Sequence, residues 1–141
     1  MPKTNFLQLA ETRRSVRAYK PDEVPEELLQ TVLEAGRLAP SAVNKQPWRF
    51  LVVRSETGRR ALGAAYAREW FWKAPVIIVV CILPQEAWVR SYDGKNYAMV
   101  DGALAMDHMQ LAAAELGLGT CWIGAFDPAA AREILGLPDG V

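Results

Sequence analysis

Histidine and cysteine are scarce in this chain, and their scarcity narrows the chemistry that the chain can support. Its 141 residues include one histidine, His108, and two cysteines, Cys81 and Cys121, with no Cys-x-x-Cys pair. A metal site built from clustered histidine and cysteine is therefore disfavoured. His108 falls inside a long helical pattern, where packing or capping is the favoured role. Both cysteines sit in apolar runs without a disulfide framework, which indicates a reducing, cytoplasmic setting.

The chain also lacks an excess of charge and a long apolar run. Its 16 lysine and arginine residues balance its 16 aspartate and glutamate residues, which argues against an electrostatic nucleic-acid binder. The longest apolar run, 76–83, is too short to cross a bilayer, and the polar N-terminus lacks a secretory pattern. A hydrophobic content of 51% and this length predict one folded domain over residues 1–141.

Helical and extended patterns alternate along the chain, which predicts an α+β domain around one sheet. Proline marks both ends of one helix, because Pro25 occupies a favoured first-turn position and Pro40 stops the pattern. The predicted helices are 6–14, 25–40, 56–68, 97–116 and 129–135, and the predicted strands are 48–53, 76–83 and 120–126. Residues 15–19 are expected to be briefly extended, and 84–95 to be a long, mobile loop.

The longest predicted helix, 97–116, is apolar around most of its circumference. Asp101, Asp107 and Glu115 are the acidic interruptions. A helix of this kind is buried, either centrally in a monomer or across a subunit interface.

Residues 40–48 form the most informative segment. Prolines restrict its backbone near both ends, and Ser41, Asn44 and Gln46 offer a hydroxyl and two carboxamides that donate and accept hydrogen bonds. Such a loop suits a neutral polyol or heterocycle better than a metal or a bare phosphate. A helix stop followed by a turn is the alternative interpretation.

Two further segments also indicate ligand binding, less strongly than residues 40–48 do. Arg13, Arg14, Ser15 and Arg17 are typical of an anion pocket, because guanidinium groups bind phosphate bidentately; a solvated basic helix end is the alternative. In 117–124, glycines near both ends would let a flat ligand approach the main chain. A helix C-cap followed by an ordinary strand explains the same glycines.

Taken in order, these segments resemble the flavin-dependent nitroreductase family. The matching text is Arg-Arg-Ser-Val-Arg-Ala-Tyr at 13–19, Ala-Pro-Ser-Ala-Val-Asn-Lys-Gln-Pro-Trp-Arg-Phe at 39–50, and Leu-Gly-Leu-Gly-Thr-Cys-Trp-Ile-Gly at 116–124. The resemblance covers nearly the whole chain. It implies a central mixed sheet flanked by helices, a homodimer with the apolar helix and FMN at its interface, and NADH or NADPH as electron donor.

The same resemblance implies which residues bind the cofactor. The first segment would hold the FMN phosphate, the loop would line the flavin partly from the partner subunit, and the third segment would lie against the ring. These residues are Arg13, Arg14, Ser15, Arg17, Pro40, Ser41, Ala42, Asn44, Gln46, Trp122, Ile123 and Gly124. Four aromatic residues are candidates for a substrate-pocket lid, or else they pack over the core edge: Trp70, Phe71, Trp88 and Tyr92.

The implied reaction is carried by flavin N5 and requires no catalytic side chain. The resemblance implies hydride transfer from NAD(P)H and ping-pong reduction of nitroaromatics, quinones or similar flat electrophiles. Alternatives are a non-catalytic FMN store or sensor, and a specialised enzyme of the same fold such as a flavin-destroying oxygenase or a dehalogenase. Members of the family usually continue beyond the segment that ends here at Val141, so we expect the chain to lack their C-terminal extension.

Overall fold

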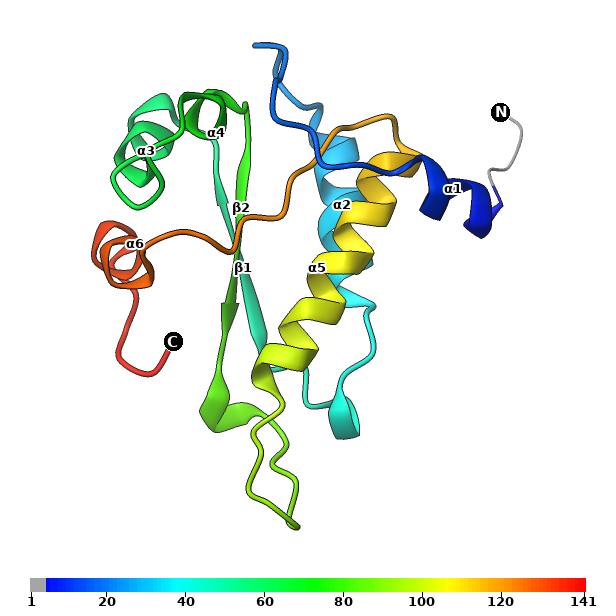
Figure 1. The fold of residues 1–141 in the computed structure, drawn as a ribbon, viewed down its shortest axis with the longest axis vertical. Coiled ribbons are helices and arrows are strands. Elements are labelled where there is room, and N and C mark those ends of the chain that lie inside the picture. The colour runs from blue at the N-terminus through cyan, green and yellow to red at the C-terminus, as the bar shows by residue number, and fades with distance from the viewer. Residues whose placement is uncertain (1–4) are drawn as a thin grey trace.

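A small antiparallel sheet separates two groups of helices. The computed structural model describes residues 5–141, in which β1 (Trp48–Val53) pairs with β2 (Ile77–Ile82) so that Trp48 lies opposite Ile82. Figure 1 shows the two strands at the centre of the molecule with helices on either side. The structure confirms the α+β class and both of these predicted strands. The predicted central mixed sheet is wrong, because the described residues form one two-stranded antiparallel sheet.

Two long helices cover one face of this sheet. They are α2 (Glu26–Arg37) and α5 (Ala98–Glu115), and their contact buries Val32 against Met109. The helices approach closely because Gly36 has no side chain. A Cβ built there would lie 2.7 Å from Met109 Cγ. The predicted long apolar helix is therefore present, and one side of it belongs to the core.

Three shorter helices lie on the other side of the sheet. They are α3 (Glu56–Leu62), α4 (Glu69–Lys73) and α6 (Pro128–Leu135), on the left in Figure 1. The side chain of Asp127 caps α6 by accepting backbone hydrogen bonds, as a first-turn aspartate commonly does. Its own amide donates to Ala65 O at 2.9 Å, which ties α6 to the chain just after α3.

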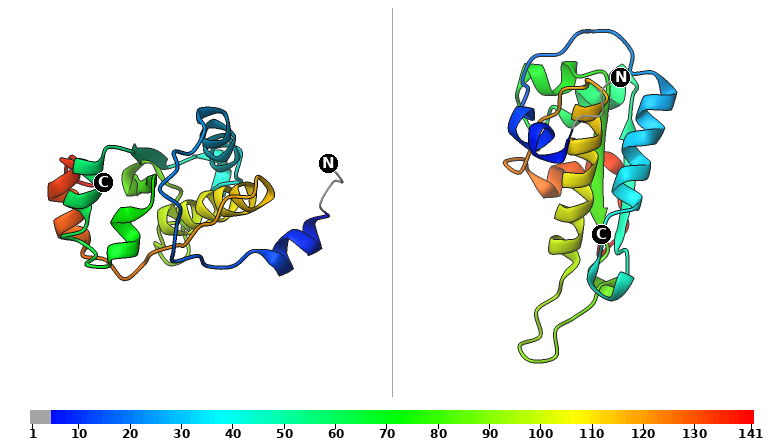
Figure 2. Two further views of the ribbon diagram at one scale, coloured as in Figure 1. Left: turned by 90° about the horizontal axis from the view of Figure 1, so that it is seen from above. Right: turned by 90° about the vertical axis from the view of Figure 1, so that its right-hand side faces the viewer.

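The first helix, α1 (Phe6–Thr12), projects from the body near the C-terminal end of α5 (Figure 2). None of its residues is buried, and Phe6 and Leu7 are 66% and 72% exposed. Its apolar face is therefore uncovered by the part of the chain that the structure describes. Two short 3-10 turns, η1 (Ala42–Asn44) and η2 (Pro84–Glu86), complete the helical elements.

The predicted loop at 84–95 begins with η2 and continues into a projection. Residues 87–97, which we call the arm, fold back on themselves below the body in Figure 1. Arg90 donates to Asp93 Oδ1 at 2.9 Å and to the phenol of Tyr97 at 2.8 Å. The arm therefore has internal side-chain contacts, which its sequence did not indicate.

Two other sequence predictions need correction. The predicted strand 120–126 is an extended segment with one isolated parallel bridge, Ser15 to Thr120, because it meets neighbouring backbone at one residue pair before running toward α6. The predicted helix 56–68 ends at Leu62. Gly63 follows it with a Cβ position that Arg60 O and Trp72 already crowd.

Residues 5–141 contain no helix with the length and apolarity that a membrane crossing requires. Within the same residues, no cluster of histidine, cysteine and carboxylate side chains could hold a metal ion.

Candidate functional site

The structure brings two of the three predicted site segments side by side. Residues 13–19 run next to 117–124, and the Val16 amide donates to Thr120 O at 2.8 Å. This hydrogen bond accompanies the parallel bridge between Ser15 and Thr120. The predicted extended form of 15–19 thus places the arginine-serine segment against the glycine-bracketed segment.

The arginines of the first segment are available to an anion. Arg14 and Arg17 are exposed, and among residues 5–141 neither these two nor Arg13 forms an ion pair with a carboxylate. Ser15, also exposed, adds a hydroxyl between them. Guanidinium groups without an internal carboxylate fit the phosphate of a mononucleotide such as FMN.

Tyr19 makes a further hydrogen bond within this segment. Its phenol donates to Val16 O at 2.6 Å. Burial raises the pKa of Tyr19 to about 12, with a smaller contribution from nearby Cys121. The phenol therefore stays protonated and keeps its hydrogen bond at neutral pH.

The third segment presents an open main chain. Trp122 is 46% exposed, Ile123 is partly buried, and nothing lies within 4 Å of a Cβ position on Gly124. One side of a flat ring could therefore approach the backbone at Gly124 without a side chain intervening.

The loop 40–46 is held in an unusual backbone conformation. Val43, Asn44 and Gln46 have φ values of 54°, 54° and 50°, a region that is costly for a β-branched residue such as Val43. Ser41 Oγ accepts a hydrogen bond from the Gln46 amide at 2.9 Å. The side chains of Asn44 and Gln46 are exposed, so their carboxamides remain free to meet a ligand.

Helix α5 carries two buried polar residues, and each contacts one of the site segments. Asp101 is 1% exposed, and its Oδ1 accepts from the Ala42 amide at 3.0 Å. Gln110 is 8% exposed, and its Nε2 donates to Thr120 Oγ1 at 3.4 Å. Sequence reasoning did not assign either residue to the site, and the one available signal for Asp101 was a carboxylate early in an apolar helix.

These contacts also show that one chain does not assemble all three segments. Asp101 lies in the first turn of α5 and holds the loop, whereas the 13–19 and 117–124 segments lie at the opposite end of the helix (Figure 1). Gln110, which contacts Thr120, lies nine residues beyond Asp101, so these two contacts are about 14 Å apart along the helix axis. Within one chain the loop therefore lies apart from the other two segments.

An apolar cavity of about 650 Å³ is lined by β2, the 117–124 segment, the long helices α2 and α5, and the three short helices. Val16 and Ala18 line it, whereas the alternate residues Ser15 and Arg17 do not, and from Tyr19 on consecutive residues line it. The alternation over 15–18 is the one expected of an extended backbone, with polar and apolar side chains on opposite sides. Trp70 and Phe71, both lid candidates, also line this cavity.

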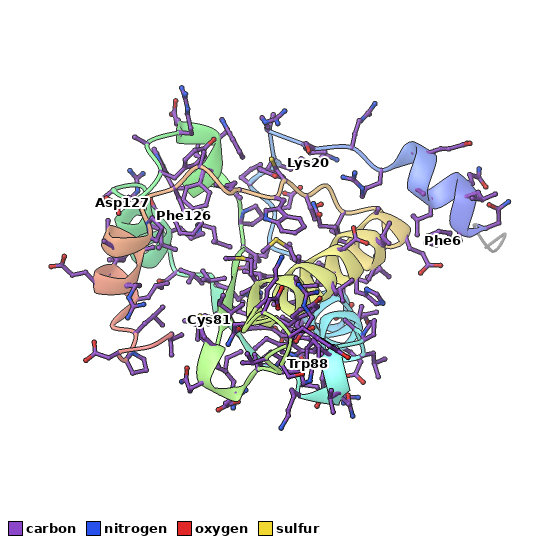
Figure 3. The ribbon with its side chains drawn as sticks, turned by 60° about the horizontal axis from the view of Figure 1, so that its bottom comes forward. Phe6, Lys20, Cys81, Trp88, Phe126 and Asp127 are labelled. Carbon is purple, nitrogen blue, oxygen red and sulfur yellow. The ribbon has the colours of Figure 1, made fainter. Side chains whose placement is uncertain are left out.

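The other two lid candidates lie elsewhere. Trp88 packs edge-on against Tyr97 with ring centroids 4.9 Å apart, and Tyr92 is 97% exposed on the arm. Figure 3 shows Trp88 well away from Phe126, a residue that lines the cavity. Within one chain, the aromatic residues of the arm therefore do not cover the cavity.

Comparisons with known proteins agree with this fold. The model of the Nitroreductase family matches residues 10–70 and 63–141. A Thermus thermophilus protein named NADH dehydrogenase is 33% identical over 168 residues, which cover 98% of this chain and 82% of that protein. The chain belongs to the nitroreductase family.

Solved structures give the same result. A nitroreductase family protein from Clostridium difficile 630 superposes with a TM-score of 0.91 and 38% identity, covering 97% of this chain and 78% of that one. An FMN-dependent nitroreductase from Clostridium difficile R20291 superposes with a TM-score of 0.82 and 28% identity, covering 96% of this chain and 80% of that one.

Proposed function

We propose that this protein is an FMN-dependent oxidoreductase that takes hydride from NAD(P)H and reduces flat electrophiles such as nitroaromatics or quinones. The names of its relatives support an NAD(P)H-dependent flavin enzyme. The observation that carries the proposal is the pairing of the arginine-serine segment with the open backbone at 122–124. The two together offer a phosphate site beside a surface for a planar ring.

Each segment has a distinct part in this proposal. Arg13, Ser15 and Arg17 bind the phosphate, and Arg14 assists them. Trp122 and Ile123 lie against the isoalloxazine ring, and the Gly124 amide faces its N5 edge. The loop residues, Pro40, Ser41, Ala42, Asn44 and Gln46, contact the flavin from a second copy of the chain.

The second copy is needed because the loop lies at the far end of α5. Two copies related by a two-fold axis across α5 would place the loop of one beside the arginine segment of the other. The exposed side of α5 supports such a pairing, because Met99, Val100 and Leu104 are 71%, 41% and 37% exposed. Burying these side chains against their counterparts would stabilise a homodimer.

Bound FMN would supply a hydride acceptor and donor at N5. The protein's own contribution is orientation: the arginines fix the phosphate, the backbone at Gly124 fixes the ring edge, and apolar side chains limit water on the open face. Donor and acceptor would use that face in turn, so we expect ping-pong kinetics. Trp70 and Phe71 border the apolar cavity on the same chain, and Tyr92 reaches outward on the arm toward a partner.

Anaerobic titration of the FMN-loaded protein with NADH and NADPH tests this function. The expected result is loss of the oxidised flavin absorbance, followed by its return when a quinone or nitroaromatic compound is added. Protein that binds no FMN would overturn the proposal. Bound flavin that neither nucleotide reduces would instead indicate a store or sensor, and conversion of the flavin itself in air would indicate a flavin-destroying enzyme.

A further inference from the structure

The most deeply buried ionisable group near the loop is the carboxylate of Asp101. Its residue is 1% exposed, yet its side chain has one hydrogen-bonding partner in the part of the chain that the structure describes. Oδ1 accepts from the Ala42 amide at 3.0 Å, and Oδ2 has no partner there. A buried carboxylate with a single hydrogen bond is costly, so its stabilising effect on the fold alone does not explain it.

The bond from Ala42 starts the η1 turn. Ser41 precedes this turn without capping it, because its Oγ accepts from the Gln46 amide. The carboxylate of Asp101, on a helix distant in sequence, accepts from the amide of the first residue of the turn. A charged acceptor makes the stronger form of this hydrogen bond.

The turn needs such support because three of the next four residues have a strained backbone. Val43, Asn44 and Gln46 all have positive φ, and a backbone of this kind persists only where its surroundings determine it. The Ala42 amide is the anchored start of the turn, and the Asn44 and Gln46 carboxamides extend from the part beyond it.

We infer that Asp101 is a positioning residue for ligand binding: its buried carboxylate holds the Ala42 amide and thereby sets where the carboxamides of Asn44 and Gln46 meet the flavin of the partner subunit. The inference rests on the proposed function. It deepens that function by assigning a role to a residue that contacts no cofactor.

Substitution at both ends of the hydrogen bond tests this role. Asp101→Ala removes the acceptor, Asp101→Asn keeps an acceptor oxygen of the same shape, and Ala42→Pro removes the donor at a position where proline suits a helical turn. Glu133→Gln is the control, because Glu133 is an exposed carboxylate on α6, outside α5 and the loop. FMN affinity is measured by quenching of flavin fluorescence, and folding by the thermal midpoint of the flavin-free protein.

We expect Asp101→Ala to weaken FMN binding on the order of tenfold or more, as loss of a charged hydrogen bond does. Asp101→Asn should recover part of that loss, and Glu133→Gln should bind like the parent. In a double-mutant cycle, Asp101→Ala with Ala42→Pro should lose no more affinity than either single variant. The visible circular dichroism of bound flavin should change in Asp101→Ala and not in the control.

Two results would overturn the inference. One is Asp101→Ala binding FMN within about twofold of the parent, the usual limit of additivity between independent sites. The other is that Asp101→Ala and Asp101→Asn lose the same FMN affinity and that their thermal midpoints also fall by the same amount. A residue that serves folding alone would behave in this way. If Asp101→Ala does not fold, Asp101→Asn and Ala42→Pro decide between the same outcomes. Failure of the parent to bind FMN would count against the proposed function. Hydrogen exchange would still test the hydrogen bond, because the Ala42 amide should lose protection in Asp101→Ala.

Discussion

A Cβ placed on Gly119 would lie 2.9 Å from Cγ2 of Val16, and the other side-chain carbons of Val16 are 3.1 Å away. The two segments of the candidate phosphate and ring site therefore touch where one of them has no side chain. Valine is branched at Cβ and has little rotamer freedom with which to move aside. The identity of residue 119 thus sets the spacing between the two segments.

Gly119→Ala should therefore separate these segments. Overpacking of a tight contact typically costs about 1–3 kcal/mol, so we expect the free energy of unfolding to fall by that amount. FMN affinity should fall as well, because the arginines move relative to the ring-binding backbone. Urea unfolding and flavin titration measure the two effects.

Gly124→Ala is the informative companion. Nothing lies within 4 Å of its Cβ position, so stability should stay close to that of the parent. FMN affinity should nevertheless fall if the ring lies against this residue. Unchanged FMN binding in Gly124→Ala would contradict the placement of Gly124 at the ring.

The arginine segment is expected to recognise phosphate in particular. Arg17→Gln should weaken FMN binding on the order of tenfold or more, since a hydrogen bond to a charged group contributes about 1.5–3 kcal/mol. Riboflavin, which has no phosphate, should bind parent and variant equally. Arg37→Gln is a suitable control because Arg37 pairs with Glu34 on α2. An equal loss for riboflavin and FMN would show that Arg17 does not address the phosphate.

Homodimer formation depends on the exposed side of α5 in this proposal. Met99→Asp puts a charge where the side chain is 71% exposed in one chain and would be buried between two. We expect the variant to elute as a monomer from a sizing column, with a preserved helical circular dichroism spectrum and weaker FMN binding. A parent protein that is monomeric and still binds FMN would contradict the shared site.

Alkaline pH should weaken the fold through Tyr19. Its folded-state pKa is raised to about 12, mainly by burial, from an ordinary value of 10.0. A raised pKa means that the stabilising contribution is complete below pH 10 and is lost as the pH rises toward 12. Partial exposure of the ring reduces this contribution below its full linkage value.

Tyr19→Phe tests this dependence. The variant lacks the hydrogen bond to Val16 O and should be about 1 kcal/mol less stable near neutral pH. The difference between parent and variant should shrink above roughly pH 10, because only the parent loses stability from Tyr19 there. Unfolding free energies measured in parallel across that range cancel the effects of the other titrating groups. A constant difference would mean that Tyr19 does not titrate differently in the folded state.

Tyr92 on the arm tests the proposed reach into a partner's substrate pocket. Because it is 97% exposed, Tyr92→Ala should leave the thermal midpoint unchanged. The KM for a flat acceptor should rise if the ring stacks on substrate, while reduction of the flavin by nucleotide stays the same. An unaltered KM would remove Tyr92 from the pocket.

The elements most predictable from sequence were those specified by local pattern. The apolar run at 48–53 became β1 with the same bounds, and the 97–116 pattern became α5. A turn residue likewise identified α6, because Asp127 caps it. In each case, the periodicity or capping residue lies within the element itself.

Features that depend on contacts distant in sequence were not predictable. The strand expected at 120–126 failed because a strand requires a neighbouring backbone, and residue composition does not report one. The contacts within the arm, Arg90–Asp93 and Arg90–Tyr97, were also not predicted, although they are local, because no periodicity indicates such side-chain interactions. Asp101 was missed for the same reason, since its partner is the Ala42 amide.

The pairing of Ser15 with Thr120 has a consequence for synthesis of the protein. Helices α2 and α5 and both strands lie between these residues, so this central unit can form while the chain is still emerging from the ribosome. The arginine segment, made before this central unit, has to wait for a segment made after it before its neighbour exists. Flavin capture therefore follows formation of the central unit, and bound flavin would report that these two segments have met.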